Sequence, residues 1–481
     1  MSITQVHPHI FVIMGATGNL TRLKLFPALY KLFEQRVLSG KCVILGVARK
    51  SDIDDRGFRK LAHGIIKSTN IKIDDAKFSN WCNECVFYQS LGKASLEDYK
   101  RLAARIDSIE REENLLGNRV FYIALPPKAF SNSVTSLGES GLNRSSGWTR
   151  LVIEKPFGRD IVSAQKLNKL IHKYYDESQI YRIDHFLAKE TVQNLLVFRF
   201  ANTFFEHLWN RDHVEKVEII VSEKLGIEGR ANYYEQTGAL RDMISNHLTQ
   251  LLSLVAMDTP SGLDARAIRN EKVKVLQQVK PIQADNIVFG QYSSGKIDGK
   301  AVIGYKEEDG VPENSNTETY VALRLEVPNW RWNGVPFFLY TGKRMSRKLT
   351  EIRVHFHCAP GSIFQPFENT CILEPNVLFL TLQPDEGISF RFHIKSIGEP
   401  LTLTTKDLQF KYSEVFGAPP DAYETVLLDA ITGDQTLFVH SDEVESAWQN
   451  YAPIFEMNIP LKYYPAGTDG PIEAKKLAEK L

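Results

Sequence analysis

The feature that most constrains the fold is an alternation of short apolar runs and amphipathic stretches in the first third of the chain. Four apolar, partly β-branched runs are typical of buried parallel strands: Ile10–Met14, Val43–Ala48, Val120–Ala124 and Leu151–Ile153. Amphipathic stretches predict helices between and around them: Leu20–Phe33, Arg56–Ile66, Leu96–Glu110 and Lys128–Leu137. This alternation predicts an α/β domain, a parallel sheet with helices on both faces.

The pattern changes after about Tyr181. Two stretches predict helices: Lys189–Phe200 and Gly238–Ala256. Val214–Ser222, between these two helices, predicts a strand. From Tyr320 onward, strand-like runs follow one another with little helix between them: Tyr320–Val327, Pro336–Tyr340, Glu351–Cys358, Val377–Leu382 and Ile388–Ile394. Short connections favour a mainly antiparallel sheet, so the second domain is predicted to be α+β. We place the boundary so that the domains are 1–183 and 184–481.

Composition excludes several classes of protein. The chain has 481 residues, 43% of them apolar, which excludes disorder as its main state. Lys plus Arg is 58 and Asp plus Glu is 58, so the basic excess of a nucleic-acid-binding protein is missing. No uncharged apolar run approaches the ~20 residues that span a bilayer, and no secretory signal is visible. We therefore expect neither a nucleic-acid nor a membrane partner.

The five cysteines indicate a reducing compartment, because an odd, sparse set in a long chain does not predict a disulfide framework. Cys82 and Cys85 form one CxxC pair, but no second pair supplies the other ligands of a structural zinc. We expect no metal and a cytoplasmic location.

The first predicted strand ends in a glycine-rich turn, Gly15-Ala16-Thr17-Gly18-Asn19-Leu20, and a helical pattern starts at once. Glycines at such a turn let the backbone approach a pyrophosphate, and the free N–H groups of the helix start supply donors. The spacing is GxxGxL rather than GxGxxG, so an ordinary strand-to-helix turn explains these residues equally well.

The second strand strengthens the case for a dinucleotide. NAD-preferring enzymes place Asp or Glu at its end to bind the ribose 2′-hydroxyl, whereas this chain has Arg49 and Lys50 there. A guanidinium suits a 2′-phosphate, so the sequence favours NADP. The alternative is a solvated basic strand end.

Further motifs appear in order along the chain. Four of them are Glu154–Gly158, Arg182–Glu190, Glu223–Arg230 and Gly238–His247. Four more follow: Asn329–Pro336, Thr341–Arg344, Gln383–Ile388 and Asp442–Trp448. Together with Gly15–Leu25 they closely resemble the glucose-6-phosphate dehydrogenase family, nearly from end to end.

The resemblance implies a Rossmann-like NADP-binding domain followed by an α+β substrate-binding and dimerisation domain. It implies oxidation of D-glucose 6-phosphate at C1 to 6-phospho-D-glucono-1,5-lactone with hydride transfer to NADP, the first oxidative step of the pentose phosphate pathway. It also implies a homodimer or a dimer of dimers, built through the antiparallel sheet.

The resemblance assigns His247 as the base that takes the C1 hydroxyl proton and Asp184 as its partner. A histidine has a suitable pKa, and a carboxylate behind it fixes the imidazole tautomer. Helical spacing does not place Asp242 in the same pocket, because residues five apart lie about 140° from each other on a regular helix.

Substrate-binding positions are implied in the same way. His185 and Lys189 are four apart, so on a helix they share a face where a sugar phosphate would offset their repulsion. An amphipathic helix with incidental basic residues is the alternative. The remaining residues implied to bind substrate are Glu223, Asp242, Lys343, Lys155 and Lys348.

The resemblance assigns a set of residues to the cofactor: Gly15, Thr17, Gly18, Asn19, Leu20, Lys24, Arg49, Pro126 and Lys155. It also implies a cis Lys155–Pro156 bond.

The chain departs from the family pattern at several positions. Phe186 replaces a Tyr whose hydroxyl normally touches the phosphate, and a raised KM is expected from that loss. The other departures are Asn19 for Asp, Ala188 for Gly, Tyr340 for Arg and Asp469 for Trp.

Two rival functions remain at this stage. A dehydrogenase of unphosphorylated sugars would share the nucleotide fold and the Glu-Lys-Pro motif. A non-catalytic metabolite-binding protein would have an eroded site, which intact His247, Asp184, Lys189 and Lys155 argue against.

Overall fold

A computed structural model describes residues 6–37, 40–69, 71, 74–358, 374–398, 402–417 and 420–479. Cys371, one of the five cysteines, lies outside this range. The chain divides into two compact units. The first holds residues 1–188, 264–266 and 420–444, and the second holds 189–263, 267–419 and 445–481. The first unit thus includes residues 420–444, which a single boundary at residue 183 assigns to the second domain.

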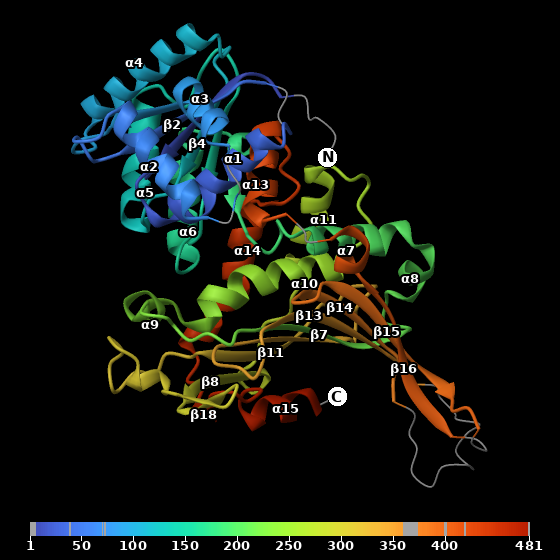
Figure 1. Ribbon diagram of the computed structural model, residues 1–481. Helices are drawn as coiled ribbons and strands as arrows, with labels where there is room; N and C mark the ends of the chain where they lie inside the picture. The colour runs from blue at the N-terminus through green and yellow to red at the C-terminus, as the bar shows by residue number, and fades with distance from the viewer. Residues whose placement is uncertain are drawn as a thin grey trace. The chain divides into compact units, whose positions relative to one another are not determined.

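The first unit is built on a seven-stranded sheet in the order β17-β6-β5-β4-β1-β2-β3 (Figure 1). Its strands are β1 (His9–Met14), β2 (Cys42–Ala48), β3 (Val86–Ser90), β4 (Arg119–Ile123), β5 (Thr149–Ile153), β6 (Ile180–Ile183) and β17 (Phe438–Val439). All neighbours pair in parallel except β17, which is antiparallel to β6. The predicted α/β domain is therefore confirmed.

Helices cover both faces of this sheet. They are η1 (Thr21–Leu25), α1 (Phe26–Glu34), α2 (Asp55–Lys67), α3 (Asp75–Cys85), α4 (Leu96–Glu113), α5 (Pro127–Glu139), α6 (Ile161–His172) and α13 (Ala422–Thr432). One core cluster joins α1, α2, α3 and α13 to alternate strand residues such as Phe11 and Ile13. Ile10 and Val12, which point to the opposite face, are also fully buried. Burial on both faces explains why the strands are continuous apolar runs.

Three strands and three α-helices of this unit were absent from the sequence prediction: β3, β6 and β17, and α3, α6 and α13. β3 is an edge strand with the polar end Gln89-Ser90, and β6 carries Arg182, so neither is a plain apolar run. α3 contains Cys82 and Cys85, which lie one turn apart and pack in the core cluster as free thiols.

The second unit contains a nine-stranded sheet in the order β16-β15-β14-β13-β7-β12-β11-β8-β18. Its strands are β7 (Val214–Ser222), β8 (Ile287–Ser293), β11 (Tyr320–Glu326), β12 (Pro336–Gly342), β13 (Leu349–Phe356), β14 (Val377–Gln383), β15 (Gly387–Lys395), β16 (Leu403–Lys411) and β18 (Leu461–Pro465). A two-stranded sheet pairs β9 (Gly295–Ile297) with β10 (Lys300–Val302). Only β7–β12 and β8–β18 pair in parallel in the larger sheet, which confirms the mainly antiparallel prediction.

The helices of this unit are α7 (Glu190–Ala201), α8 (Thr203–Leu208), α9 (Ala231–Ala239), the π-helix η3 (Leu240–Leu248), α10 (Thr249–Ala256), α12 (Tyr412–Phe416) and α15 (Ile472–Glu479). Two more, α11 (Ala265–Gln277) and α14 (Ser441–Tyr451), begin in segments of the first unit and end in the second. The predicted helix over Gly238–Ala256 is divided among the end of α9, η3 and α10. Gly238, inside α9, has a φ of 63° that interrupts the helix, and the Leu240 N–H at the start of η3 donates to Glu318 at 3.0 Å.

Candidate active site

The glycine-rich turn joins β1 to η1 in a conformation that requires glycine. Gly15 has a φ of 100°, and a Cβ there would lie 2.3 Å from the carbonyl oxygen of Ala124. The Gly18 N–H donates to the Gly15 carbonyl at 2.9 Å and closes the turn. Backbone with no side chain at Gly15 and Gly18 is what close approach of a diphosphate demands.

A cavity of about 640 Å³ opens beside this turn. A second, smaller cavity of about 370 Å³ lies in the second unit and is described below. The carboxyl ends of β1, β2 and β4 line the larger cavity, at the edge where parallel sheets bind nucleotides. Of the predicted cofactor residues, those lining it are Gly15, Thr17, Gly18, Arg49 and Pro126. The described lining does not include Asn19, Leu20, Lys24 or Lys155.

Four basic side chains belong to the lining of this cavity. Arg49 and Lys50 follow β2, Lys93 follows β3, and Lys128 lies in the first turn of α5. This cluster of cations suits a ligand with several phosphates. Sequence reasoning missed Lys93 and Lys128, because neither lies in a recognisable motif and only the fold brings them to Arg49.

Lys24 takes part in a contact that the sequence did not predict. Its ammonium donates to the Asp421 carboxylate at 2.8 Å and lies 5.6 Å from the centre of the Tyr423 ring. Burial raises the pKa of Asp421, but hydrogen bonds from Lys24 and the Tyr423 N–H outweigh it and lower the pKa overall. A role for Lys24 toward cofactor or substrate stays a prediction.

His185 lies in a turn after β6, beside Glu154, which directly follows β5. Its Nε2 is 3.1 Å from Glu154 Oε2 and 3.1 Å from the Tyr423 hydroxyl. Tyr122 donates to the other oxygen of Glu154. Burial raises the pKa of Glu154, but hydrogen bonds and the charge of His185 lower it below its usual value overall. The carboxylate is therefore held in its ionised form.

The predicted helical face shared by His185 and Lys189 is wrong. His185 is in the turn, whereas Lys189 is the N-cap of α7, so the two do not share a helix. The local reason is that the Asp184 side chain accepts the Phe186 N–H at 2.8 Å and stabilises a turn in place of a helix start. The predicted cis Lys155–Pro156 bond is present.

In the second unit, Glu223 and Lys343 form an ion pair 2.5 Å long. They follow β7 and β12, adjacent parallel strands in which Ser222 pairs with Gly342. Lys343 is buried and lies 5.2 Å from the centre of the Tyr234 ring. The structure thus brings together two residues that the sequence assigned to the substrate separately.

His247 and Asp242 both belong to the π-helix η3. Residues five apart are bonded neighbours in a π-helix, so the 140° separation expected on a regular helix does not apply. The Tyr233 hydroxyl donates to Asp242 at 3.2 Å, and His247 is buried. The sequence offered no sign of the π-helix.

The structure gives the positions of the other predicted site residues, and their roles stay predictions. Asp184 is buried in the first unit and His247 in the second, so their pairing stays a prediction. Lys348 is exposed just before β13, and Lys155 is half-buried beside the cis bond.

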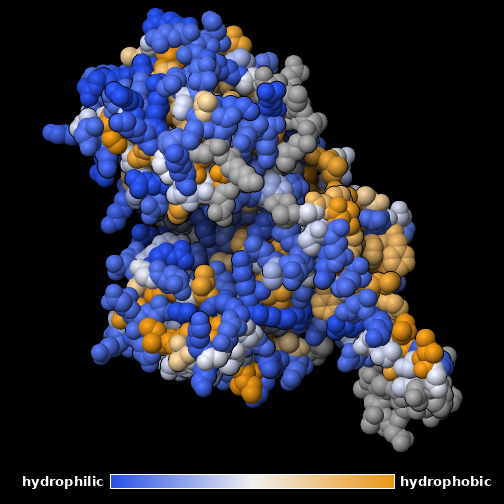
Figure 2. All heavy atoms as spheres, in the orientation of Figure 1, coloured by the Kyte–Doolittle hydropathy of each residue, from blue (hydrophilic) through white to orange (hydrophobic). Residues whose placement is uncertain are grey.

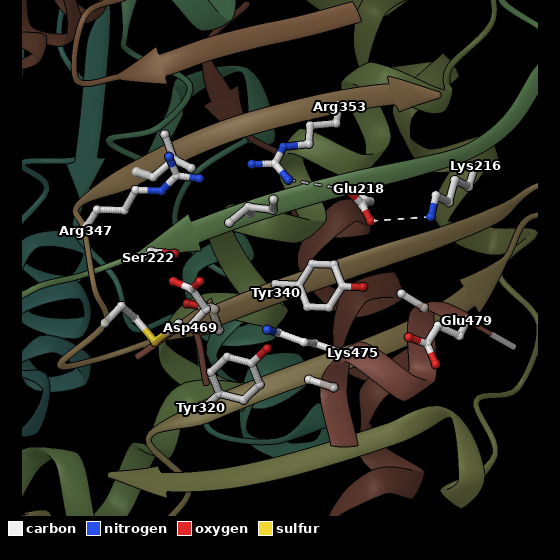
Figure 3. A pocket seen from close by; sticks show the side chains of 16 residues that line it. Lys216, Glu218, Ser222, Tyr320, Tyr340, Arg347, Arg353, Asp469, Lys475 and Glu479 are labelled. Carbon is white, nitrogen blue, oxygen red and sulfur yellow. Dashed lines mark ion pairs between the residues drawn. The ribbon is translucent and has the colours of Figure 1, made fainter. Parts of the chain in front are cut away.

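The smaller cavity lies in the second unit, between strands of the large sheet and α15 (Figure 3). Figure 3 shows charged side chains of both signs around it, among them Arg347, Glu218 and Lys475. None of the residues predicted for substrate or cofactor lines it.

No helix among the described residues is long and apolar enough to span a membrane. A parallel sheet with a glycine turn and a cationic cavity at its carboxyl edge define a dinucleotide-binding protein.

Comparison with known proteins makes this class specific. The model of the glucose-6-phosphate dehydrogenase NAD binding domain matches residues 12–194, and that of the C-terminal domain matches 196–481. The chain belongs to the glucose-6-phosphate dehydrogenase family.

Relatives match over nearly their whole length. Glucose-6-phosphate 1-dehydrogenase of Aggregatibacter actinomycetemcomitans is 44% identical, with 98% of this chain and 95% of that protein covered. The enzyme of the same name from Bacillus subtilis is 39% identical, with 100% and 98% covered. A solved glucose-6-phosphate dehydrogenase in complex with its substrate glucose-6-phosphate is 34% identical, with a TM-score of 0.90 and 99% and 98% of the chains covered.

Proposed function

We propose that this chain oxidises D-glucose 6-phosphate at C1 to 6-phospho-D-glucono-1,5-lactone and transfers the hydride to NADP. The observation that carries the proposal is the match to this family along both units, in a chain whose nucleotide cavity has Arg49 at the end of β2. The step is the first oxidative reaction of the pentose phosphate pathway.

The nucleotide cavity fits NADP. Gly15 and Gly18 leave the backbone open to the diphosphate, and Arg49 lines the same cavity with a guanidinium that suits the 2′-phosphate. When bound, NADP supplies the hydride acceptor. The chain's own contribution there is to hold and orient the dinucleotide.

The substrate is held at both ends in this proposal. Lys343 donates to a sugar hydroxyl and Glu223 and Asp242 accept from others. Lys343 and Glu223 neutralise each other. An uncharged sugar ring can therefore bind beside them without leaving either charge unpaired. His185 and Lys189 bind the phosphate end, and Lys155 reaches the nicotinamide side and the substrate. Lys348 is assigned to the substrate by family resemblance alone.

His247 is the proposed base. Its imidazole takes the proton of the C1 hydroxyl as hydride leaves C1, and Asp184 stabilises the imidazolium that forms. No metal takes part in the proposed reaction.

The proposal includes a cytoplasmic homodimer or dimer of dimers. β16 is an edge strand of the large sheet and carries exposed Leu408 and Phe410. Figure 2 shows apolar side chains gathered over the region of β15 and β16. Val415 and Phe416 of α12, which directly follows β16 in the chain, are also exposed. A second copy would cover these side chains and the open edge.

The purified chain should produce NADPH absorbance when NADP is mixed with glucose 6-phosphate, and much less with fructose 6-phosphate, mannose 6-phosphate or free glucose. Turnover of free glucose above that of glucose 6-phosphate would instead support a dehydrogenase of unphosphorylated sugars. Binding of the sugar phosphate without turnover would support a non-catalytic metabolite-binding protein.

A further inference from the structure

We propose that Glu154 is a positioning residue for the substrate's phosphate group: its buried carboxylate holds the imidazole of His185 by one nitrogen and leaves the other nitrogen to the phosphate. The inference rests on the proposed function, because it concerns how the same site recognises a sugar phosphate. Nothing in the sequence motif assigns a role to Glu154.

Three elements of the first unit fix the imidazole. Glu154, after β5, lies 3.1 Å from His185 Nε2, and Tyr423, from α13, places its hydroxyl at the same distance from that nitrogen. The Tyr423 and His185 rings have their centres 4.7 Å apart. Tyr122, from β4, donates to Glu154 Oε1 and so orients the carboxylate. The ring therefore has little freedom to turn.

The other nitrogen is left without a partner. His185 Nδ1 is buried and makes no hydrogen bond with any described residue. A buried polar atom without a partner is unfavourable, so this nitrogen indicates a group that the bound ligand supplies. A phosphate oxygen is such a group, and it accepts a hydrogen bond.

Charge favours the same arrangement. To donate to Glu154 and to a phosphate at once, the imidazole must carry a proton on each nitrogen and is then a cation. The ionised Glu154 offsets that charge on one side and the phosphate offsets it on the other. Without Glu154, a ring protonated on one nitrogen alone could present a lone pair to the phosphate, and the contact would become repulsive.

Glu154→Gln tests the proposal because it keeps the size of the side chain and removes its charge. The ratio of kcat/KM for glucose 6-phosphate to kcat/KM for free glucose should fall about tenfold, the effect of one charge-assisted hydrogen bond. The loss should lie mainly in KM for glucose 6-phosphate. Tyr122→Phe is the matched control: it removes a donor to the same carboxylate but leaves the His185 contact, so the ratio should change much less.

A double-mutant cycle separates positioning from a structural role. In a His185→Asn background, adding Glu154→Gln should lower the ratio no further, because Glu154 acts through His185. A full additional loss, or an equal loss with both substrates, overturns the inference. If Glu154→Gln does not fold, Glu154→Asp, which withdraws the carboxylate by one methylene, is judged by the same ratio.

The two proposals can fail separately. If the unmodified chain turns over no sugar phosphate, the proposed function fails. If it turns over glucose 6-phosphate and Glu154→Gln leaves the ratio unchanged, only the role of Glu154 fails.

Discussion

His247 shows how the surroundings of a predicted site residue can differ from those expected from the sequence. The motif from Gly238 to His247 marked it as a base, but regular helical geometry separated it from Asp242. The π-helix η3 changes that spacing, and nothing in the residue types of Leu240–Leu248 predicts such a helix. Glu154 is a second example. It lies within a recognised motif, but its partner Tyr423 is 269 residues away in the sequence, so the motif does not predict their contact.

His247→Asn should lower kcat for glucose 6-phosphate by at least ~100-fold, because the amide cannot take the C1 hydroxyl proton. Substrate binding should remain nearly intact, since the side chain keeps its size and polarity. Steady-state kinetics and calorimetric titration with the sugar phosphate check both parts. A variant that retains most of its kcat would remove His247 from the mechanism.

Arg49→Ala should raise KM for NADP much more than KM for NAD, because only NADP carries the 2′-phosphate that we propose the guanidinium binds. Lys50→Ala is the matched control at the neighbouring position, and we expect it to have a smaller effect. Initial rates with each dinucleotide give the comparison. Equal increases for both would assign Arg49 to a part that the two cofactors share.

Phe186→Tyr should lower KM for glucose 6-phosphate about fivefold, the value of one neutral hydrogen bond of ~1 kcal/mol. The position lies next to His185 and is half-buried, and the family resemblance implies that a Tyr hydroxyl there touches the phosphate. KM for NADP serves as the internal control and should not change. An unchanged KM for the sugar phosphate would mean that another group already makes this contact.

At the scale of elements, periodicity predicted the helices and strands whose buried residues follow a single regular spacing. The run Val214–Ser222 matches β7 at both ends, and Leu96–Glu110 falls within α4, whose start is fixed by a capping box of Ser95 and Asp98. Prediction failed where a local contact overrides periodicity. The Asp184 side chain turns the chain at His185, and β6 keeps Arg182 buried by pairing it with Glu177.

The start of β1 gives a pH dependence of stability. Burial lowers the pKa of His9 from 6.5 to about 4, although its hydrogen bond to the His7 carbonyl opposes the shift. Below pH ~6.5 the unfolded chain binds a proton at His9 that the folded chain does not bind until about pH 4, so stability falls as the pH falls. Between pH 7.5 and 5 the loss from this residue is about 2 kcal/mol.

His9→Gln should remove that part of the dependence. The free energy of unfolding, measured with urea at pH 7.5 and at pH 5, should differ between the two pH values by about 2 kcal/mol less than in the unmodified chain. His7→Gln, two residues earlier and exposed, is the control and should keep the full difference. The same difference in all three proteins would mean that folding does not shift the pKa of His9.

At the scale of the whole molecule, the first unit depends on a segment that the order of the sequence hides. Helix α13 packs in the core cluster with α1, and Glu424 forms an ion pair with Lys31 across this contact. The same helix supplies Tyr423 to His185 and is preceded by Asp421, the partner of Lys24. Composition and periodicity carry no information on such a return, because they report local structure only. The glycine-rich turn at the carboxyl edge of the parallel sheet was therefore predictable from local sequence, whereas the contacts that α13 and Asp421 make with the first unit were not.

Assembly follows from the open edge of the large sheet. Leu408 and Phe410 are two apart on β16, so they share a face, and Leu408 is 65% exposed. If a second copy covers this face, Leu408→Lys buries a charge in the interface and should shift the protein from dimer to monomer. Light scattering with size-exclusion chromatography over a range of concentrations measures this shift. Leu263→Lys, at a leucine that is 70% exposed away from β16, is the control and should leave the mass unchanged. A dimer that persists in the Leu408 variant would place the interface on another surface, and a monomeric unmodified chain would refute the assembly altogether.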